Sequence, residues 1–209
     1  MLTKAGEPIE VAHIYPFSMR SERIVNRSIP CFWNSLYMFW SEERVNAWYA
    51  AILSKGTETC HNLICLSPSA HRYWEKAHFA LKPIGLSDDK KRLDIEFFWL
   101  TKSHHTELTV LQRPILSGHS HQGPNRTMLM NCLTEEAICS GDQITLETDD
   151  PVAHPLPNLQ LLEMQWFLHR VTAAAEPQHH FGDDIPGAPQ EIESDEDMDS
   201  VSDTDPKDS

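Results

Sequence analysis

Hydrophobic residues recur at steps of three and four between residues 32 and 53, a spacing that predicts amphipathic helix. Ser41 with Glu42-Glu43 behind it predicts that a helix restarts within this run, and Lys55-Gly56 predicts its end. Because an aromatic stripe at helical spacing usually faces a core, we expect these side chains to be buried. The stripe comprises Phe32, Trp33, Leu36, Tyr37, Trp40, Val45, Trp48, Tyr49, Ile52 and Leu53.

Two short segments on either side of this helical region predict strands. Residues 9–18 alternate between apolar and polar positions and leave through a proline, and residues 60–66 form a short apolar run. Ser67-Pro68 then predicts a helix start, with serine as N-cap and proline in the first turn. We expect this helix to run through His71, Trp74, Glu75 and His78 towards Lys82-Pro83, where proline would stop it.

The second half of the chain predicts further strands and one long helix. Strand candidates occupy residues 93–100, 108–116, 127–133 and 143–148, and an amphipathic helix opens at Asn158 and continues towards Ala175. Strands and helices that do not alternate regularly indicate an α+β fold. We therefore expect one α+β domain over residues 1–182.

The composition is that of a globular protein, with 40% hydrophobic and 23% charged residues in 209. No apolar run is long enough for a membrane span, and no secretory signal is visible, so we expect neither membrane association nor secretion. The cysteines contain no C-x-x-C pair, which indicates reduced thiols in an intracellular protein of the nucleus or cytoplasm. They are Cys31, Cys60, Cys65, Cys132 and Cys139, and we expect Cys60 and Cys65 to be small buried hydrophobes.

Most of the net charge of −14 comes from residues 183–209, which hold eleven acidic residues and one lysine. This segment lacks aromatic residues and is predicted to be a disordered acidic tail. A solubilising role, a mimic of nucleic acid, a kinase target and a recruiter of a basic protein partner all remain open. If the tail screens a basic site, its deletion should raise nucleic-acid affinity most at low salt.

A histidine, an asparagine and a second histidine fall at chemically suggestive places in the predicted strand–strand–helix order. His13 lies on the first strand, Asn62 opens the second, and His71 follows on the helix. An imidazole can accept a proton from water near neutral pH, and an amide can hold that ring in register. A ligand on a helix can place a divalent metal against a phosphate.

These stretches resemble the HNH endonucleases, whose ββα-metal motif has His, Asn and His in this order. The likeness is greatest to fungal proteins with an HNH nuclease domain, and it implies a ββα unit within about residues 9–83 of the larger domain. The matching stretches are Val11 to Ser18, Asn62 to Ser67, His71-x-x-Trp74, Phe79 to Pro83, Pro155-Leu-Pro157 and Leu162-x-x-Gln165-Trp166.

The resemblance implies a role for each residue of the set in hydrolysing phosphodiester bonds in DNA. His13 would be the general base, Asn62 would orient the hairpin and His13, and His71 would bind one divalent metal ion. Glu75 shares a helical face with His71 and is the second ligand candidate, with His78 a further candidate. Carboxylate and imidazole ligands accept Mg²⁺, Mn²⁺ or Zn²⁺, so the ligands do not select the metal.

Two departures from the family pattern favour the alternative of an inactive HNH-fold binding or interaction module. Many active enzymes place a metal ligand immediately before the base, where this chain has Ala12. Leu2-Thr3-Lys4 begins in the middle of the strand that usually precedes the histidine, so a shortened first strand or missing upstream sequence is expected.

Basic residues are concentrated near the predicted site although the chain as a whole is acidic. Residues 20–27 carry a net charge of +2 and residues 72–92 a net charge of +3. We expect phosphate contacts from Arg20, Arg23, Arg72 and Lys76, which would make DNA the partner of an active enzyme. An exposed charged face without a special role is the competing interpretation.

Overall fold

The computed structural model describes residues 2–6, 8–15, 28–101 and 120–175. Contacts divide the chain into the units Met1–Gln178 and His179–Ser209, and every described residue belongs to the first. Helices and strands both contribute to this unit, so the predicted α+β class is confirmed. The predicted strand 108–116 and the acidic tail 183–209 lie outside the described residues.

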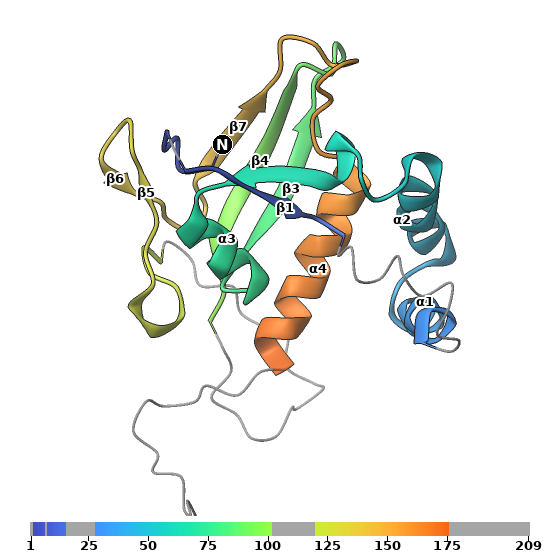
Figure 1. Cartoon of the computed structure of the whole chain (residues 1–209). Helices are drawn as coiled ribbons and strands as arrows, with labels where there is room; N and C mark the ends of the chain where they lie inside the picture. Colours follow the sequence, from blue (N-terminus) through green and yellow to red (C-terminus); the bar gives the residue numbers. More distant parts are fainter. Residues whose placement is uncertain (1, 7, 16–27, 102–119, 176–209) are drawn as a thin grey trace, which may run out of the picture. The chain divides into compact units, whose positions relative to one another are not determined.

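A two-stranded antiparallel sheet and one helix form a ββα unit (Figure 1). Strand β1 (Glu10–His13) pairs with β2 (Leu63–Leu66), with Glu10 opposite Leu66 and His13 opposite Leu63. Helix α3 (Pro68–Glu75) follows β2 and packs on both strands. The hairpin therefore joins two segments about 50 residues apart in sequence, and the intervening chain folds into helices.

In the sequence, two helices occupy the stretch between β1 and β2, as the hydrophobic periodicity predicts. Helix α1 (Ser28–Phe39) and helix α2 (Glu42–Lys55) are separated at Ser41, which takes the extended N-cap conformation. Gly56 ends α2 with φ of 78° and ψ of 177°, a positive-φ conformation that glycine adopts without strain. Trp33, Leu36, Val45 and Trp48 of the stripe are buried. The prediction of burial was wrong for Tyr37, Tyr49 and Leu53, which are exposed.

Helix α3 starts at Ser67-Pro68 as predicted, but the prediction that it continues to Lys82-Pro83 was wrong. Its backbone closes in a Schellman arrangement, in which His78 N–H donates to Tyr73 C=O at 2.9 Å and Ala77 N–H donates to Trp74 C=O at 3.0 Å. Ala77 takes the left-handed conformation with φ of 49°. His78 consequently lies beyond the helix, buried and stacked on Tyr73.

The segment expected to end α3 is instead the edge strand of a three-stranded antiparallel sheet. Strands β3 (Phe79–Leu86), β4 (Arg92–Trp99) and β7 (Gln143–Glu147) lie in the order β3-β4-β7. Pro83 lacks an N–H group, and an edge strand tolerates it beside the register shift between Pro83 and Gly85. The strands predicted at 93–100 and 143–148 are confirmed.

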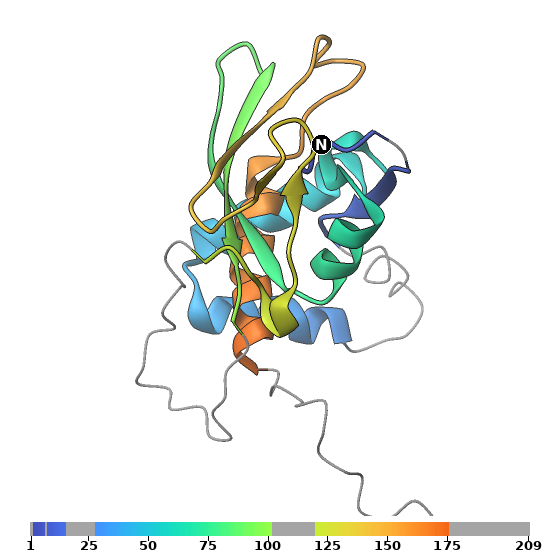
Figure 2. The same ribbon diagram turned by 90° about the vertical axis from the view of Figure 1, so that its left-hand side faces the viewer.

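Helix α4 (Leu159–Ala175) runs alongside β3 and contacts α2 (Figures 1 and 2). Asn158 caps it, because the asparagine Oδ1 accepts hydrogen bonds from Gln160 N–H at 2.8 Å and Leu161 N–H at 3.3 Å. The helix buries Leu161, Leu162 and Met164 in the main core. The predicted C-terminal helix is therefore confirmed with its starting signal.

Short elements complete the described part. They are the 3-10 turns Cys60–Asn62 and Pro124–Arg126 and the paired strands β5 (Met130–Asn131) and β6 (Glu136–Ala137). The predicted strand 127–133 is thus reduced to two residues, because Leu129 and Cys132 form backbone hydrogen bonds with Ile138 and Thr3. Among the described residues, no helix combines the length and apolar character that crossing a membrane requires.

Candidate functional site in the ββα unit

His13, Asn62 and His71 all belong to the ββα unit. His13 is the last residue of β1, Asn62 directly precedes β2, and His71 lies within α3. Backbone pairing brings Asn62 to the His13 end of the hairpin, since Ile14 N–H donates to Asn62 C=O at 2.8 Å. His71 has partners at the other end of β1, as described below.

Asn62 is buried and its side chain connects two separate stretches of backbone. Its Oδ1 accepts a hydrogen bond from Tyr15 N–H at 2.7 Å, and its Nδ2 donates to Tyr15 C=O and Thr57 C=O, both at 3.0 Å. Asn62 as a whole residue is only 1% exposed, so water cannot replace these hydrogen bonds. Asn62 therefore fixes the chain that leaves β1 against the loop that follows α2.

That loop carries an acidic partner for His13. Glu58 Oε1 lies 2.9 Å from His13 Nε2, and the two side chains are 51% and 29% exposed. Glu58 is separated from His13 by 45 residues. No local sequence pattern links the two residues, so the sequence contained no signal for this pair.

His71 lies between two carboxylates. Its Nδ1 is 2.7 Å from Glu10 Oε2, and its Nε2 is 3.7 Å from Glu75 Oε1. The Glu75 contact follows from the helical spacing of four residues. The sequence analysis did not identify Glu10. The alternation of side chains along β1 could have indicated this residue, because residues 10 and 12 share one face of the strand.

The same alternation explains what surrounds Ala12 and His13. Ala12 is 1% exposed and contributes to the core together with Ile64 and Leu66. Val11 and Cys65 oppose each other on the other face of the hairpin and are exposed. The prediction that Cys65 and Cys60 are buried was therefore wrong, since both thiols are exposed.

The two histidines consequently form two clusters within one unit. The His13 ring meets Glu58 at the end of β1, whereas the His71 ring meets Glu10 at its start. Three residues of extended strand separate these ends by roughly 10 Å. Trp74 links α3 to the His13 end, because its indole N–H donates to His13 C=O at 3.2 Å.

One imidazole and two carboxylates lie together around His71, and both kinds of group bind divalent metal ions. Among the described residues, no group of three His, Cys, Asp or Glu side chains is arranged to hold a metal ion. The donor chemistry nonetheless matches a common arrangement, in which a carboxylate accepts a hydrogen bond from one ring nitrogen and leaves the other to the metal. Here Glu10 is in the position of that carboxylate, and Glu75 adjoins the second nitrogen.

The predicted phosphate contacts are only partly described. Arg72 and Lys76 are exposed on and just after α3, each one residue beyond a member of the His71–Glu75 pair. Arg20 and Arg23 lie outside the described residues. His78, proposed as a further ligand, does not share the His71 helical face because α3 ends before it.

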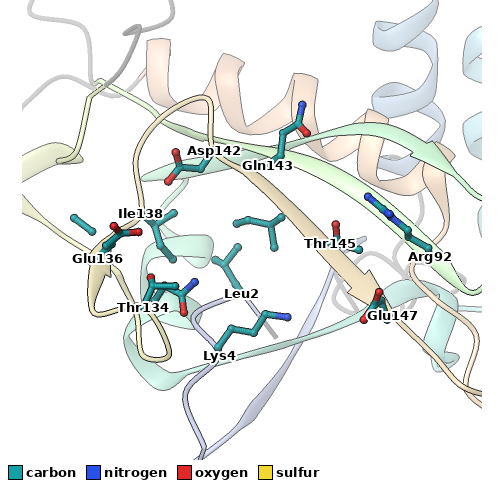
Figure 3. Close-up of a pocket in the computed structure, with 13 residues that line it drawn as sticks. Leu2, Lys4, Arg92, Thr134, Glu136, Ile138, Asp142, Gln143, Thr145 and Glu147 are labelled. Atoms are coloured by element: carbon teal, nitrogen blue, oxygen red, sulfur yellow. The ribbon is translucent and has the colours of Figure 1, made fainter.

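The cavity with mixed charge in Figure 3 is a different place in the molecule. It has a volume of about 490 Å³ and lies beside β7, with Lys4, Arg92, Glu136 and Glu147 among its lining residues. None of the described residues that the sequence predicts to form the site lines this cavity. The cavity is therefore separate from the candidate residues of the ββα unit.

Comparison with known proteins gives one match. Residues 1–82 match the HNH_2 family model, which is described as HNH endonuclease. No curated protein and no solved structure matches the chain. The matched range contains β1, β2 and α3 with His13, Asn62 and His71. The predicted resemblance to the HNH endonuclease family is therefore confirmed.

Proposed function

We propose, from the match of residues 1–82 to the HNH endonuclease family model, that the chain is a metal-dependent endonuclease that hydrolyses phosphodiester bonds in DNA. One observation carries the proposal. The matched range contains a β1–β2–α3 unit in which His13 ends the first strand, Asn62 precedes the second and His71 lies on the helix.

His13 is the proposed general base. With Nε2–H donating to Glu58, the neutral ring carries its lone pair on Nδ1, which can accept a proton from water. The water oxygen forms a bond to phosphorus, the phosphorus–oxygen bond to the leaving strand breaks, and the water proton moves to Nδ1. The leaving oxygen then takes a proton from solvent. Asn62 supports this geometry by holding the backbone immediately after His13.

His71 and Glu75 are the proposed metal ligands. Glu10 accepts the Nδ1–H of His71 and thereby keeps the lone pair on Nε2, the nitrogen that faces Glu75. A divalent ion bound there would supply positive charge to the scissile phosphate and to the leaving oxygen. Mg²⁺, Mn²⁺ and Zn²⁺ all accept this pair of ligands.

Arg72 and Lys76 are the proposed contacts to the DNA backbone from the described residues. Both are exposed, and both adjoin the proposed metal ligands in sequence. Contacts to phosphate position a nuclease without selecting a sequence. The proposal therefore includes affinity for DNA in general and no target sequence.

A catalytically inactive HNH-fold module is the second candidate, and one observation favours it. Ala12 occupies the position where many family members have a ligand, and it is buried in the core. Under this alternative the same surface binds nucleic acid or protein without cleaving it.

Nicking of a supercoiled plasmid by the full chain tests the two candidates. The assay contains Mg²⁺, Mn²⁺ or Zn²⁺, and the variants His13→Ala and His71→Ala are purified in parallel with His121→Ala, an exposed histidine outside the ββα unit. Metal-dependent nicking that is lost in the first two variants and kept in the third supports the nuclease. A folded wild-type protein that binds DNA without nicking it supports the inactive module.

A further inference from the structure

His13, the proposed catalytic base, is hydrogen-bonded to Glu58. The 2.9 Å separation of Nε2 and Oε1 is a hydrogen-bond distance, and a carboxylate can only accept. The proton of the neutral ring is therefore held on Nε2. An imidazole in this tautomer presents its lone pair on Nδ1, on the opposite side of the ring from Glu58.

The loop that carries Glu58 is held at each neighbouring residue. Gly56 N–H donates to Ile52 C=O at 3.1 Å, and Thr59 Oγ1 is 3.5 Å from Gly56 C=O. Thr57 is buried, and its C=O accepts from Asn62 Nδ2 at 3.0 Å. Thr59 C=O in turn accepts from Asn62 N–H at 2.8 Å. Glu58 thus projects from a loop that the backbone fastens on both sides.

Asn62 connects this loop to the strand end that carries His13. Its side chain bonds both backbone groups of Tyr15 and also Thr57 C=O. Tyr15 lies two residues after His13, and Thr57 lies one residue before Glu58. One buried amide therefore sets the spacing between the base and its carboxylate partner.

We infer that Glu58 is a positioning residue for His13, an inference that rests on the proposed function. Glu58 accepts the hydrogen bond from Nε2–H, fixes the ring with its lone pair on Nδ1, and balances the positive charge that the ring gains when it takes the proton from water. Glu58 does not touch the water or the phosphate. Its effect therefore passes through His13.

The tautomer of His13 gives a readout that does not depend on catalysis. Long-range proton–nitrogen NMR spectra of the full chain with labelled histidine separate protonated from unprotonated ring nitrogens, and the spectrum of His13→Ala identifies the signals of His13. We expect the Nε2–H tautomer in wild type and in Glu58→Gln, whose amide oxygen still accepts the hydrogen bond. Glu58→Ala should give a mixture of tautomers, and Glu43→Ala, at an exposed position of α2, should match wild type.

The same variants are then compared in steady-state cleavage. Exposed ion pairs contribute little to stability, so the Glu58 variants are expected to fold. Glu58→Ala should lower kcat by about tenfold to a hundredfold, the usual effect of losing a partner that orients a functional histidine. KM should stay within about twofold because phosphate contacts are unchanged, and Glu58→Gln should recover part of kcat.

Each outcome separates this inference from the proposed function. A wild-type His13 tautomer in Glu58→Ala overturns the inference, as does a wild-type kcat in that variant when His13→Ala is inactive, and in both cases the nuclease remains. A wild-type protein that does not cleave overturns the proposed function and the catalytic role of Glu58 together. The tautomer spectra then still show whether Glu58 holds the ring.

Discussion

Asn62 binds both backbone groups of Tyr15, accepting from its N–H at 2.7 Å and donating to its C=O at 3.0 Å. This side-chain pairing continues the contact between the two segments one residue beyond their last backbone hydrogen bond, which Ile14 N–H donates to Asn62 C=O. The strand end is therefore held by an amide that has no freedom to turn, because its third bond goes to Thr57.

Replacement of Asn62 by alanine should destabilise the fold strongly. The substitution leaves Tyr15 N–H, Tyr15 C=O and Thr57 C=O without this partner in a buried place, and unsatisfied buried groups cost about 1–3 kcal/mol each. We expect urea denaturation to show a loss on the order of 3 kcal/mol in the free energy of unfolding. Asn46→Ala, which removes an exposed hydrogen bond to Tyr37, should cost less than about 1 kcal/mol. Equal losses in the two variants would contradict this assignment.

Glu10 should strengthen metal binding although it faces the ring nitrogen remote from Glu75. Titration of the full chain with Mn²⁺, followed by the electron paramagnetic resonance of the free ion, measures this directly. Loss of a carboxylate that orients a ligating histidine weakens metal affinity about tenfold to a hundredfold, and we expect this for Glu10→Ala. His71→Ala and Glu75→Gln should weaken binding at least as much. Glu43→Ala is the control with the same change in charge, and wild-type affinity in Glu10→Ala would remove Glu10 from the site.

Arg72 and Lys76 should contribute to DNA affinity through phosphate alone. We expect Arg72→Ala and Lys76→Ala each to reduce the slope of log affinity against log salt by about one and to weaken binding to all sequences alike. Fluorescence anisotropy with two unrelated duplexes over a range of salt concentrations measures both effects. Arg126→Ala, at an exposed turn in the second half of the chain, should leave the slope unchanged. A slope that none of the three variants changes would mean that DNA binds elsewhere.

His169 makes the stability of the fold depend on pH. Burial lowers the pKa of this histidine from 6.5 to about 4, although its hydrogen bond to Phe79 C=O opposes the shift. Between these values the unfolded chain binds a proton that the folded protein does not, so the free energy of unfolding falls as pH drops from 6.5 towards 4. Over this pH range the titration of His169 lowers the free energy of unfolding by a total on the order of 3 kcal/mol. Above pH 6.5 and below pH 4, His169 adds no further pH dependence.

Urea denaturation of His169→Gln at several pH values tests this contribution. The variant should have a flatter dependence between pH 6.5 and 4 than wild type, whatever its absolute stability. His121→Gln, at an exposed position, should retain the wild-type dependence. If the slopes of wild type and His169→Gln coincide, another group is responsible for the acid sensitivity.

The described thiols should differ in reactivity. Cys60, Cys65 and Cys132 are exposed, whereas Cys139 is half-buried and its Sγ donates to Ala137 C=O at 3.4 Å. Burial raises the pKa of the Cys139 thiol, and the nearby Asp142 and Glu136 carboxylates add to this effect. Since the thiolate is the reactive form, we expect alkylation at pH 8 to label Cys139 last. Peptide mass spectrometry resolves the sites, and labelling of Cys139 as fast as Cys60 would contradict the expectation.

The sequence predicted helices well where a regular hydrophobic periodicity or a capping residue defined them. The apolar stripe of residues 32–53, the Ser67-Pro68 start and the Asn158 cap each correspond to an element boundary or a buried face in the structure. The end of α3 was missed because Ala77 takes the left-handed position that glycine or asparagine usually marks. Without that signal, the next breaker, Pro83, was taken as the helix end.

The partners of His13 and His71 could likewise be predicted from the sequence only where a local periodicity indicates them. Glu75 follows from helical spacing, and Glu10 could have been found from the alternation along β1. Glu58 could not, because its contact with His13 exists only once α2 ends at Gly56 and Asn62 fastens the loop. A pair that two distant segments form across a fold has no signature in either segment.

Trp74 connects the ββα unit to helix α4. Its indole donates to His13 C=O, and its ring packs edge-on against His169 of α4 with centroids 4.4 Å apart. When only the first 82 residues have emerged from the ribosome, β1, β2 and α3 are present without the His169 ring that packs on Trp74. We therefore expect a truncated translation product that lacks α4 to hold Trp74, and the strand end to which Trp74 donates, less firmly than the full chain does.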